Sequence, residues 1–143
     1  MNKALLVTSL CALVLVSACG RDEARVAVNT KDAKITVAGG DASVALPDTF
    51  PKDIPIIPGG SVKAAMKTGE VTSVSMTTST SPQEVAKYYQ ENLTSQGWKI
   101  GNTIAAGKVT MLTAEKDKRQ VSLQIGDNDG KSAAIMISLR PKN

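Results

Sequence analysis

The sequence predicts an α+β fold in which a single helix packs on an antiparallel sheet. Two stretches of strict apolar and polar alternation, 119–126 and 132–140, are typical of strands in a sheet with one wet face. The segment 82–96 has helical spacing and signals for both helix ends. A lone helix is the natural cover for the dry face of such a sheet. Over residues 47–143 we therefore expect the order ββαββββ, preceded by a short β-meander or stalk.

Residues 1–18 are expected to form a secretory signal peptide. Lys3 gives a basic start, and the fifteen residues from Ala4 to Ala18 carry no charge. A basic start, a short apolar run and small residues before a cleavage site are typical of such signals. A permanent membrane span is the weaker alternative, because a spanning helix needs about 20 apolar residues.

The apolar run ends in Val16, Ser17, Ala18 and Cys19. This tetrapeptide resembles the lipobox of bacterial lipoproteins, which consists of an apolar residue, two small residues and a cysteine. The resemblance implies that the first three residues form the cleavage recognition site and that Cys19 is the lipid attachment site. Its sulfur would carry a diacylglyceryl group and its new amine a further acyl chain such as palmitate, and the lipid bilayer would be its partner. The alternative is an ordinary secretory signal with an incidental cysteine.

The residue after the cysteine bears on which membrane holds the protein. In enterobacterial lipoproteins an aspartate at this position tends to retain the protein in the inner membrane, whereas this chain has Gly20. The resemblance therefore implies a protein that faces the periplasm from the outer membrane. In a bacterium without an outer membrane, the outer face of the cell membrane would hold it.

The composition of the mature chain, residues 19–143, excludes several kinds of chemistry. The sequence has no histidine, Cys11 would leave with the signal and Cys19 would carry lipid. Serine–histidine triads, histidine-ligated zinc, cysteine nucleophiles and an internal disulfide are therefore not expected. Loss of Lys3 lowers the formal charge from +4 to +3, which is too small an excess to indicate a nucleic-acid partner. We expect no metal and no cofactor.

Residues 19–46 are expected to contain a lipidated N-terminus and a short-strand repeat. Val26, Ile35 and Val44 are equivalent at a nine-residue period. Each unit has a short alternating strand and a polar turn, which predicts a β-meander. A small stacked solenoid and a half-ordered stalk are the alternatives. A calcium-binding repeat is disfavoured, because the glycine and aspartate spacing does not match one.

The small α+β domain, residues 47–143, is expected to begin with an irregular extended arm. Four prolines between Leu46 and Gly60 favour extended backbone that ends in a Pro-Gly-Gly turn. We interpret Ile54, Ile56 and Ile57 as residues of the arm that enter the core. The alternative is an exposed hook for a partner or for the membrane.

The helix is predicted from its end signals. Ser81, Pro82 and Glu84 supply an N-cap, a proline at the first position and the partner of a capping box. Gly97 is expected to end the helix, which places it at 82–96. The buried stripe is predicted to contain Val85, Tyr89 and Leu93.

Strands are predicted on both sides of the helix. The loop 127–130 is interpreted as a hairpin turn, because calcium would need further oxygen ligands at fixed steps. The predicted strands are 61–66, 71–80, 98–105, 108–116, 119–126 and 132–140.

Three aromatic residues, Tyr88, Tyr89 and Trp98, lie close together in the sequence. Adjacent helical residues point about 100° apart, so one tyrosine is expected in the core and the other at its border. The alternative is an amphipathic platform for a ligand or peptide. The candidate binding surface therefore contains Tyr88, Tyr89, Trp98, Ile54, Ile56 and Ile57.

Four short motifs carry a second resemblance. They are Phe-Pro-x-Asp-Ile-Pro at 50–55, Pro-Gly-Gly at 58–60, Ser-Pro-x-Glu-Val-x-x-Tyr-Tyr at 81–89 and Gly-Trp at 97–98. Together they resemble a group of small bacterial envelope lipoproteins of uncharacterised function. The resemblance supports the expected fold and location but implies no activity.

The expected function is that of a membrane-anchored binding or adapter module without catalysis. Its partner would be an envelope protein or a small apolar ligand. No glycine-rich phosphate loop and no pair of catalytic carboxylates stands out in the sequence. The alternatives are an envelope enzyme that uses carboxylates or lysine, and a passive structural lipoprotein.

Overall fold

The computed structural model describes residues 25–142, so the expected signal peptide and the lipobox-like sequence that ends in Cys19 lie outside the described residues. Within 25–142 the chain forms eight strands and one helix. The strands before the helix are β1 (Arg25–Asn29), β2 (Ala33–Ala38), β3 (Ser61–Thr68) and β4 (Val71–Thr78). The helix α1 (Pro82–Ser95) follows, and then β5 (Lys99–Ala106), β6 (Val109–Lys116), β7 (Arg119–Asp127) and β8 (Ala133–Pro141).

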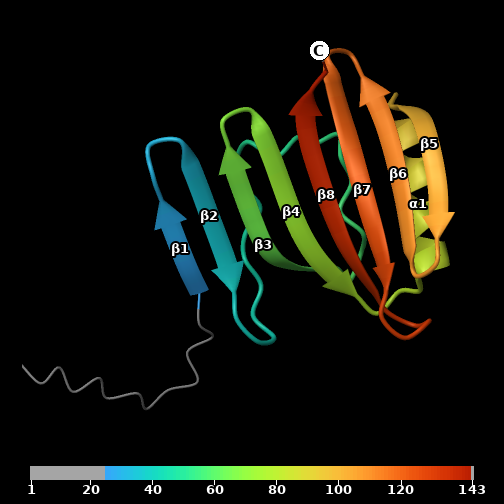
Figure 1. Ribbon diagram of the computed structural model, residues 1–143, viewed down its shortest axis with the longest axis horizontal. Coiled ribbons are helices and arrows are strands. Elements are labelled where there is room, and N and C mark those ends of the chain that lie inside the picture. Colours follow the sequence, from blue (N-terminus) through green and yellow to red (C-terminus); the bar gives the residue numbers. More distant parts are fainter. Residues whose placement is uncertain (1–24, 143) are drawn as a thin grey trace, which may run out of the picture.

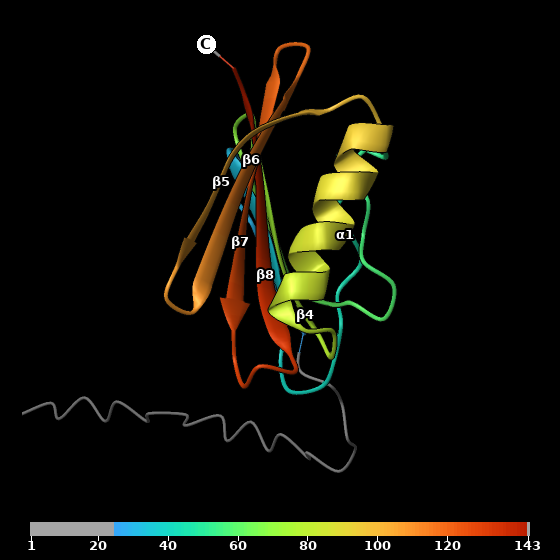
Figure 2. The same cartoon turned by 90° about the vertical axis from the view of Figure 1, so that its right-hand side faces the viewer.

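All eight strands form one antiparallel sheet in the order β1-β2-β3-β4-β8-β7-β6-β5 (Figure 1). The helix carries the chain from β4, in the middle of the sheet, to β5 at the far edge. The next three strands return by hairpins until β8 pairs with β4. Helix α1 lies over one face of the sheet, and the other face is open (Figure 2). The predicted class, one helix on an antiparallel sheet, is confirmed.

The sheet is larger than predicted, and the order ββαββββ is wrong for the described chain. Four strands precede the helix, because the first two units of the repeat form β1 and β2. Strand β2 pairs with β3 from Ala33 opposite Thr68 to Val37 opposite Ala64, so the repeat extends the main sheet. The third unit forms no strand: its Val44 makes one backbone bond to Val62 and then the chain turns into the arm.

The predicted helix signals are all present. The Ser81 side chain accepts a bond from the Glu84 backbone N–H at 3.4 Å, and the Glu84 carboxylate accepts one from the Ser81 backbone at 3.3 Å. At the other end, Gly97 has φ +83°, and the Trp98 N–H donates to the carbonyl of Leu93. This is the bond of a glycine-terminated helix end. The helix ends at Ser95, one residue before the predicted end.

The core lies between α1, the arm and the inner face of the sheet. Val85, Tyr89 and Leu93 are fully buried, which confirms the predicted stripe. Ile54 and Ile57 of the arm are buried and Ile56 is half-buried against the core, so the arm enters the core and is no exposed hook. The strand bounds differ from the predicted ones by two residues or fewer.

Candidate functional site

The aromatic residues of the candidate binding surface hold the arm in place. Trp98 and Tyr89 are buried, and Tyr88 is half-buried. The Trp98 Nε1 donates to the carbonyl of Asp53 at 3.0 Å, and the Tyr88 hydroxyl donates to the carbonyl of Ile56 at 3.2 Å. Burial raises the pKa of the Tyr89 hydroxyl. With Ile54 and Ile57 buried as well, these residues do not form an exposed surface, and the expectation of one tyrosine in the core is confirmed.

A charged cluster closes the arm against the β6–β7 hairpin. The Asp53 carboxylate accepts bonds from Lys116 Nζ at 2.9 Å and from the two Arg119 Nη atoms at 2.8 and 3.1 Å. Lys116 Nζ also donates to the carbonyl of Gln96, where the helix ends. The Arg119 guanidinium lies 5.1 Å from the centre of the Trp98 ring, within the range of a cation–π contact. Each charge in the cluster has a partner, which is the arrangement of a structural clamp.

Stability is expected to decrease at acid pH because of Asp53. The Arg119 hydrogen bonds, opposed by partial burial and aided by Lys116, hold the pKa of the Asp53 carboxyl below its usual value. The stabilisation is therefore present above about pH 4, the unfolded value, and is lost as the pH falls through the lower folded value. Urea unfolding monitored by circular dichroism between about pH 6 and pH 2.5 should show this loss.

The matched control for this prediction is Asp53→Asn. It should cost about 1–2 kcal/mol at neutral pH, because three charge-assisted bonds at a partly exposed site are weakened. Its stability should then decrease less steeply in acid than that of the original chain. Equal acid dependence in the two proteins would assign the effect to other carboxyl groups, such as Asp129, whose pKa is also lowered, by its bond to Ser132.

A hollow of about 480 Å³ lies on the helix side of the sheet, beside the arm. We call it the β2–β3 pocket. Helix α1 packs against β5, β6 and β7, so within residues 25–142 the inner face of β2 and β3 is covered by the arm and not by the helix (Figures 1 and 2). The pocket is the space that the arm leaves open there. Its walls come from Lys34, Thr36, Ala65 and Lys67 of the two strands and from Ala45, Leu46, Pro47, Asp48 and Thr49 of the arm.

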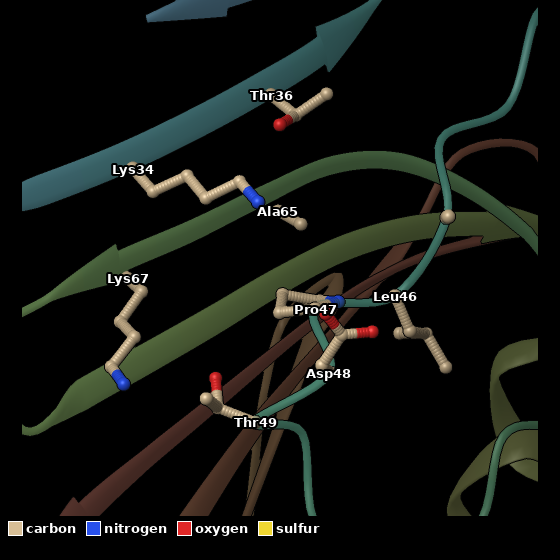
Figure 3. A pocket seen from close by; sticks show the side chains of 9 residues that line it. Lys34, Thr36, Leu46, Pro47, Asp48, Thr49, Ala65 and Lys67 are labelled. Atoms are coloured by element: carbon tan, nitrogen blue, oxygen red, sulfur yellow. The ribbon is translucent and has the colours of Figure 1, made fainter. Parts of the chain in front are cut away.

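The β2–β3 pocket combines an apolar wall with two ammonium groups. Leu46, Pro47 and Ala65 supply the apolar part. Lys34 and Lys67 lie directly opposite each other in the β2–β3 register and extend from adjacent strands on the same side as the arm (Figure 3). Among residues 25–142, neither ammonium makes an ion pair or a hydrogen bond. The arrangement suits the binding of a ligand better than acid–base chemistry.

The sequence reasoning missed the β2–β3 pocket entirely. The apolar residues of β2 alternate with Lys34 and Thr36, and this alternation predicts a strand with Lys34 and Thr36 on its solvent face. Lys34 lies opposite Lys67 only because β2 pairs with β3, a strand more than twenty residues away in the sequence. The sequence contained one sign of the pocket. In each of β2 and β3 a lysine, Lys34 or Lys67, occupies a position that lies on the inner face of the sheet.

The open face of the sheet carries several exposed apolar side chains. One row of directly paired residues crosses all eight strands and contains no charge. The nine large hydrophobic side chains that are exposed within the described chain all lie on this face by register. The row is Val26, Val37, Ala64, Ser75, Met136, Gln124, Met111 and Ile104. We call it the open-face row.

Two other features of a site are absent from the described residues. No group of three or more acidic, cysteine or histidine side chains is placed to hold a metal ion there. No helix in that part of the chain is long and apolar enough to cross a membrane.

Part of the domain is similar to one known protein family. A family model described as START domain-like matches residues 61–131, which extend from β3 through the turn after β7 and make up just under half of the chain. The domain is thus similar to START domain-like proteins over β3, β4, α1 and the next three strands. Strand β2 and the arm, which supply most of the pocket wall, lie outside the match. No curated protein and no solved structure matches the chain significantly.

Proposed function

We propose that the protein is a lipid-anchored module of the bacterial envelope that binds a small ligand in the β2–β3 pocket without catalysis. The observation that carries the proposal is the pocket itself. Its volume of about 480 Å³ falls in the range typical of small-molecule sites, about 300–1,000 Å³. A mainly apolar wall with a few polar groups is also typical of such sites.

The groups in the pocket favour binding over catalysis. Its ionisable side chains are Lys34, Lys67 and Asp48. A lysine nucleophile is activated by desolvation or by a neighbouring base, whereas Lys34 is exposed and Lys67 is half-buried. The rival function, an enzyme based on lysine or carboxylate, therefore has less support than a binding module.

The proposed anchor would hold the pocket close to the bilayer. Strand β1 starts at Arg25, six residues after Cys19. An extended chain advances about 3.3–3.6 Å per residue, so this linker spans at most about 20 Å. A protein anchored at Cys19 would present the start of β1 within that distance of the membrane, with β2 and the pocket farther along the same strands. The proposed location is the periplasmic face of the outer membrane, or the outer face of a single cell membrane.

Filling the pocket tests this function. Thr36→Trp places a large ring on the pocket wall, and Thr68→Trp places the same ring on the opposite, open face of the neighbouring strand. We expect native mass spectrometry of the purified full chain to show a retained small molecule. Thr68→Trp should keep this ligand and Thr36→Trp should lose at least about nine-tenths of it, a loss of about 1.4 kcal/mol in binding. Equal retention by the two variants would contradict the proposal.

A second candidate function is docking of an envelope protein on the open face of the sheet, to which Thr68 belongs. The nine exposed large hydrophobic side chains on this face favour it, because exposed apolar patches commonly mark protein interfaces. The same two variants separate the functions, since crosslinking in intact envelopes should then lose a partner with Thr68→Trp and keep it with Thr36→Trp. The reverse pattern, or no change with either variant, would count against an adapter.

A further inference from the structure

We propose that the ligand of the β2–β3 pocket is an anionic amphiphile: one carboxylate or phosphate group held between Lys34 and Lys67, with a short hydrocarbon chain on the apolar wall. The inference rests on the proposed function, because it names the chemical class of ligand for that same pocket. The observation behind it is the direct pairing of Lys34 with Lys67 across β2 and β3.

Two like charges directly opposite each other on one face of a sheet are unfavourable. Here the neighbouring positions in the same transverse row, Asn29 of β1 and Thr72 of β4, bring no negative charge. Asp48 lines the pocket but forms no ion pair with either lysine. An anion between the two ammonium groups would replace their repulsion with two attractive, charge-assisted contacts.

Other basic side chains that pack against the fold have partners. Lys63 Nζ donates to the carbonyls of Gly40 and Ala42 at 3.2 and 2.9 Å. Lys116 and Arg119 share the Asp53 carboxylate. Among residues 25–142, Lys34 and Lys67 are thus two inward-facing cations without an ion-pair partner, and this favours their pocket as an anion site.

The wall beside the lysines calls for a hydrocarbon group. Leu46, Pro47 and Ala65 face the same hollow. A free inorganic anion would leave this wall in contact with water, and an uncharged lipid would leave the two lysines uncompensated. Both features are used only by a molecule with an acidic head and an apolar chain, whether it is a fatty acid or a monoacyl phosphate.

The test uses the full lipidated chain in nanodiscs of uncharged phosphatidylcholine. Photoreactive decanoic acid and the matching photoreactive decanol are titrated separately, and labelling of residues 45–49 and 65 is mapped by mass spectrometry. We expect the acid to label at a concentration about tenfold lower than the alcohol, in line with charge-assisted contacts. Inorganic phosphate alone, at equal concentration, should not displace the acid.

Variants of the lysines complete the test. Lys34→Gln with Lys67→Gln should weaken labelling by the acid about tenfold without lowering the melting temperature, since it removes a repulsive pair. Lys34→Arg with Lys67→Arg should keep the labelling. The control, Lys99→Gln with Lys108→Gln, removes two exposed charges of β5 and its turn and should change nothing.

The outcomes separate this inference from the proposed function. Equal labelling by acid and alcohol would leave a binding pocket but overturn its preference for anions. Displacement by phosphate alone would overturn the amphiphile in favour of a simple anion site. Absence of labelling by either probe would overturn both the inference and the function on which it rests.

Discussion

Trp98→Ala is expected to lower the free energy of unfolding by about 3–5 kcal/mol, as is typical for the loss of a buried large aromatic side chain. Trp98 is 2% exposed, and its indole N–H is bonded to the carbonyl of Asp53. The substitution therefore leaves a cavity at the end of α1, an unpaired carbonyl and an Arg119 that has lost the ring beneath it. Trp98 is the only tryptophan in the sequence, so the variant has no tryptophan fluorescence to follow. Urea unfolding is therefore monitored by circular dichroism.

Two further variants make the Trp98 prediction specific. Trp98→Phe keeps much of the ring and loses the hydrogen bond, so we expect a smaller cost of about 1–2 kcal/mol. Met111→Ala on the open face should cost less than about 0.5 kcal/mol, since Met111 is 41% exposed. If Trp98→Ala and Met111→Ala were equally mild, the arm would contribute little to stability.

Cys19→Ala is expected to abolish lipid attachment completely. Two or three acyl chains give very slow release from a bilayer, because each buried CH₂ contributes about 0.8 kcal/mol. Without the sulfur there is no attachment point, and we expect the signal to remain uncleaved before residue 19. Metabolic labelling with a fatty acid and intact-mass measurement test both points.

The second cysteine of the sequence provides the control. Cys11→Ala lies within the proposed signal peptide and should leave labelling, cleavage and membrane fractionation unchanged. Recovery of Cys19→Ala as a processed, membrane-bound form would show that the lipobox resemblance is misleading. The pocket proposals could then still be tested, but the position of the pocket near a bilayer would lose its basis.

The structure gives the short motifs of the sequence a physical meaning. The motif at 50–55 belongs to the arm, and the motifs at 81–89 and 97–98 belong to the helix and its end. Two hydrogen bonds join the arm to the helix and its end, from Trp98 to Asp53 and from Tyr88 to Ile56. The motifs thus describe how the arm is fastened to the helix. They contribute no residue to the β2–β3 pocket, whose walls come from less distinctive stretches.

The helix could be predicted from sequence because its signals are local. Ser81, Pro82, Glu84 and Gly97 act on backbone groups within one turn of their own positions. The later strands could be predicted for a similar reason, since alternation along β7 and β8 is sufficient to mark one buried face. Predicting that the arm enters the core required one further argument, that its three isoleucines are too apolar to remain in water.

What only the tertiary structure decided is which strands pair and what the pairing brings together. The repeat at 26–46 is compatible with a stalk, a solenoid or an extension of the sheet, and the contact of β2 with β3 selects the last. The same contact places Lys34 opposite Lys67 and forms the pocket. The register of two strands is set by contacts between side chains that are distant in the sequence. The stabilising free energy of such a cross-strand pair depends on both residues, so neither strand alone predicts it. By itself the sequence determined the elements and, by resemblance, the expected anchor.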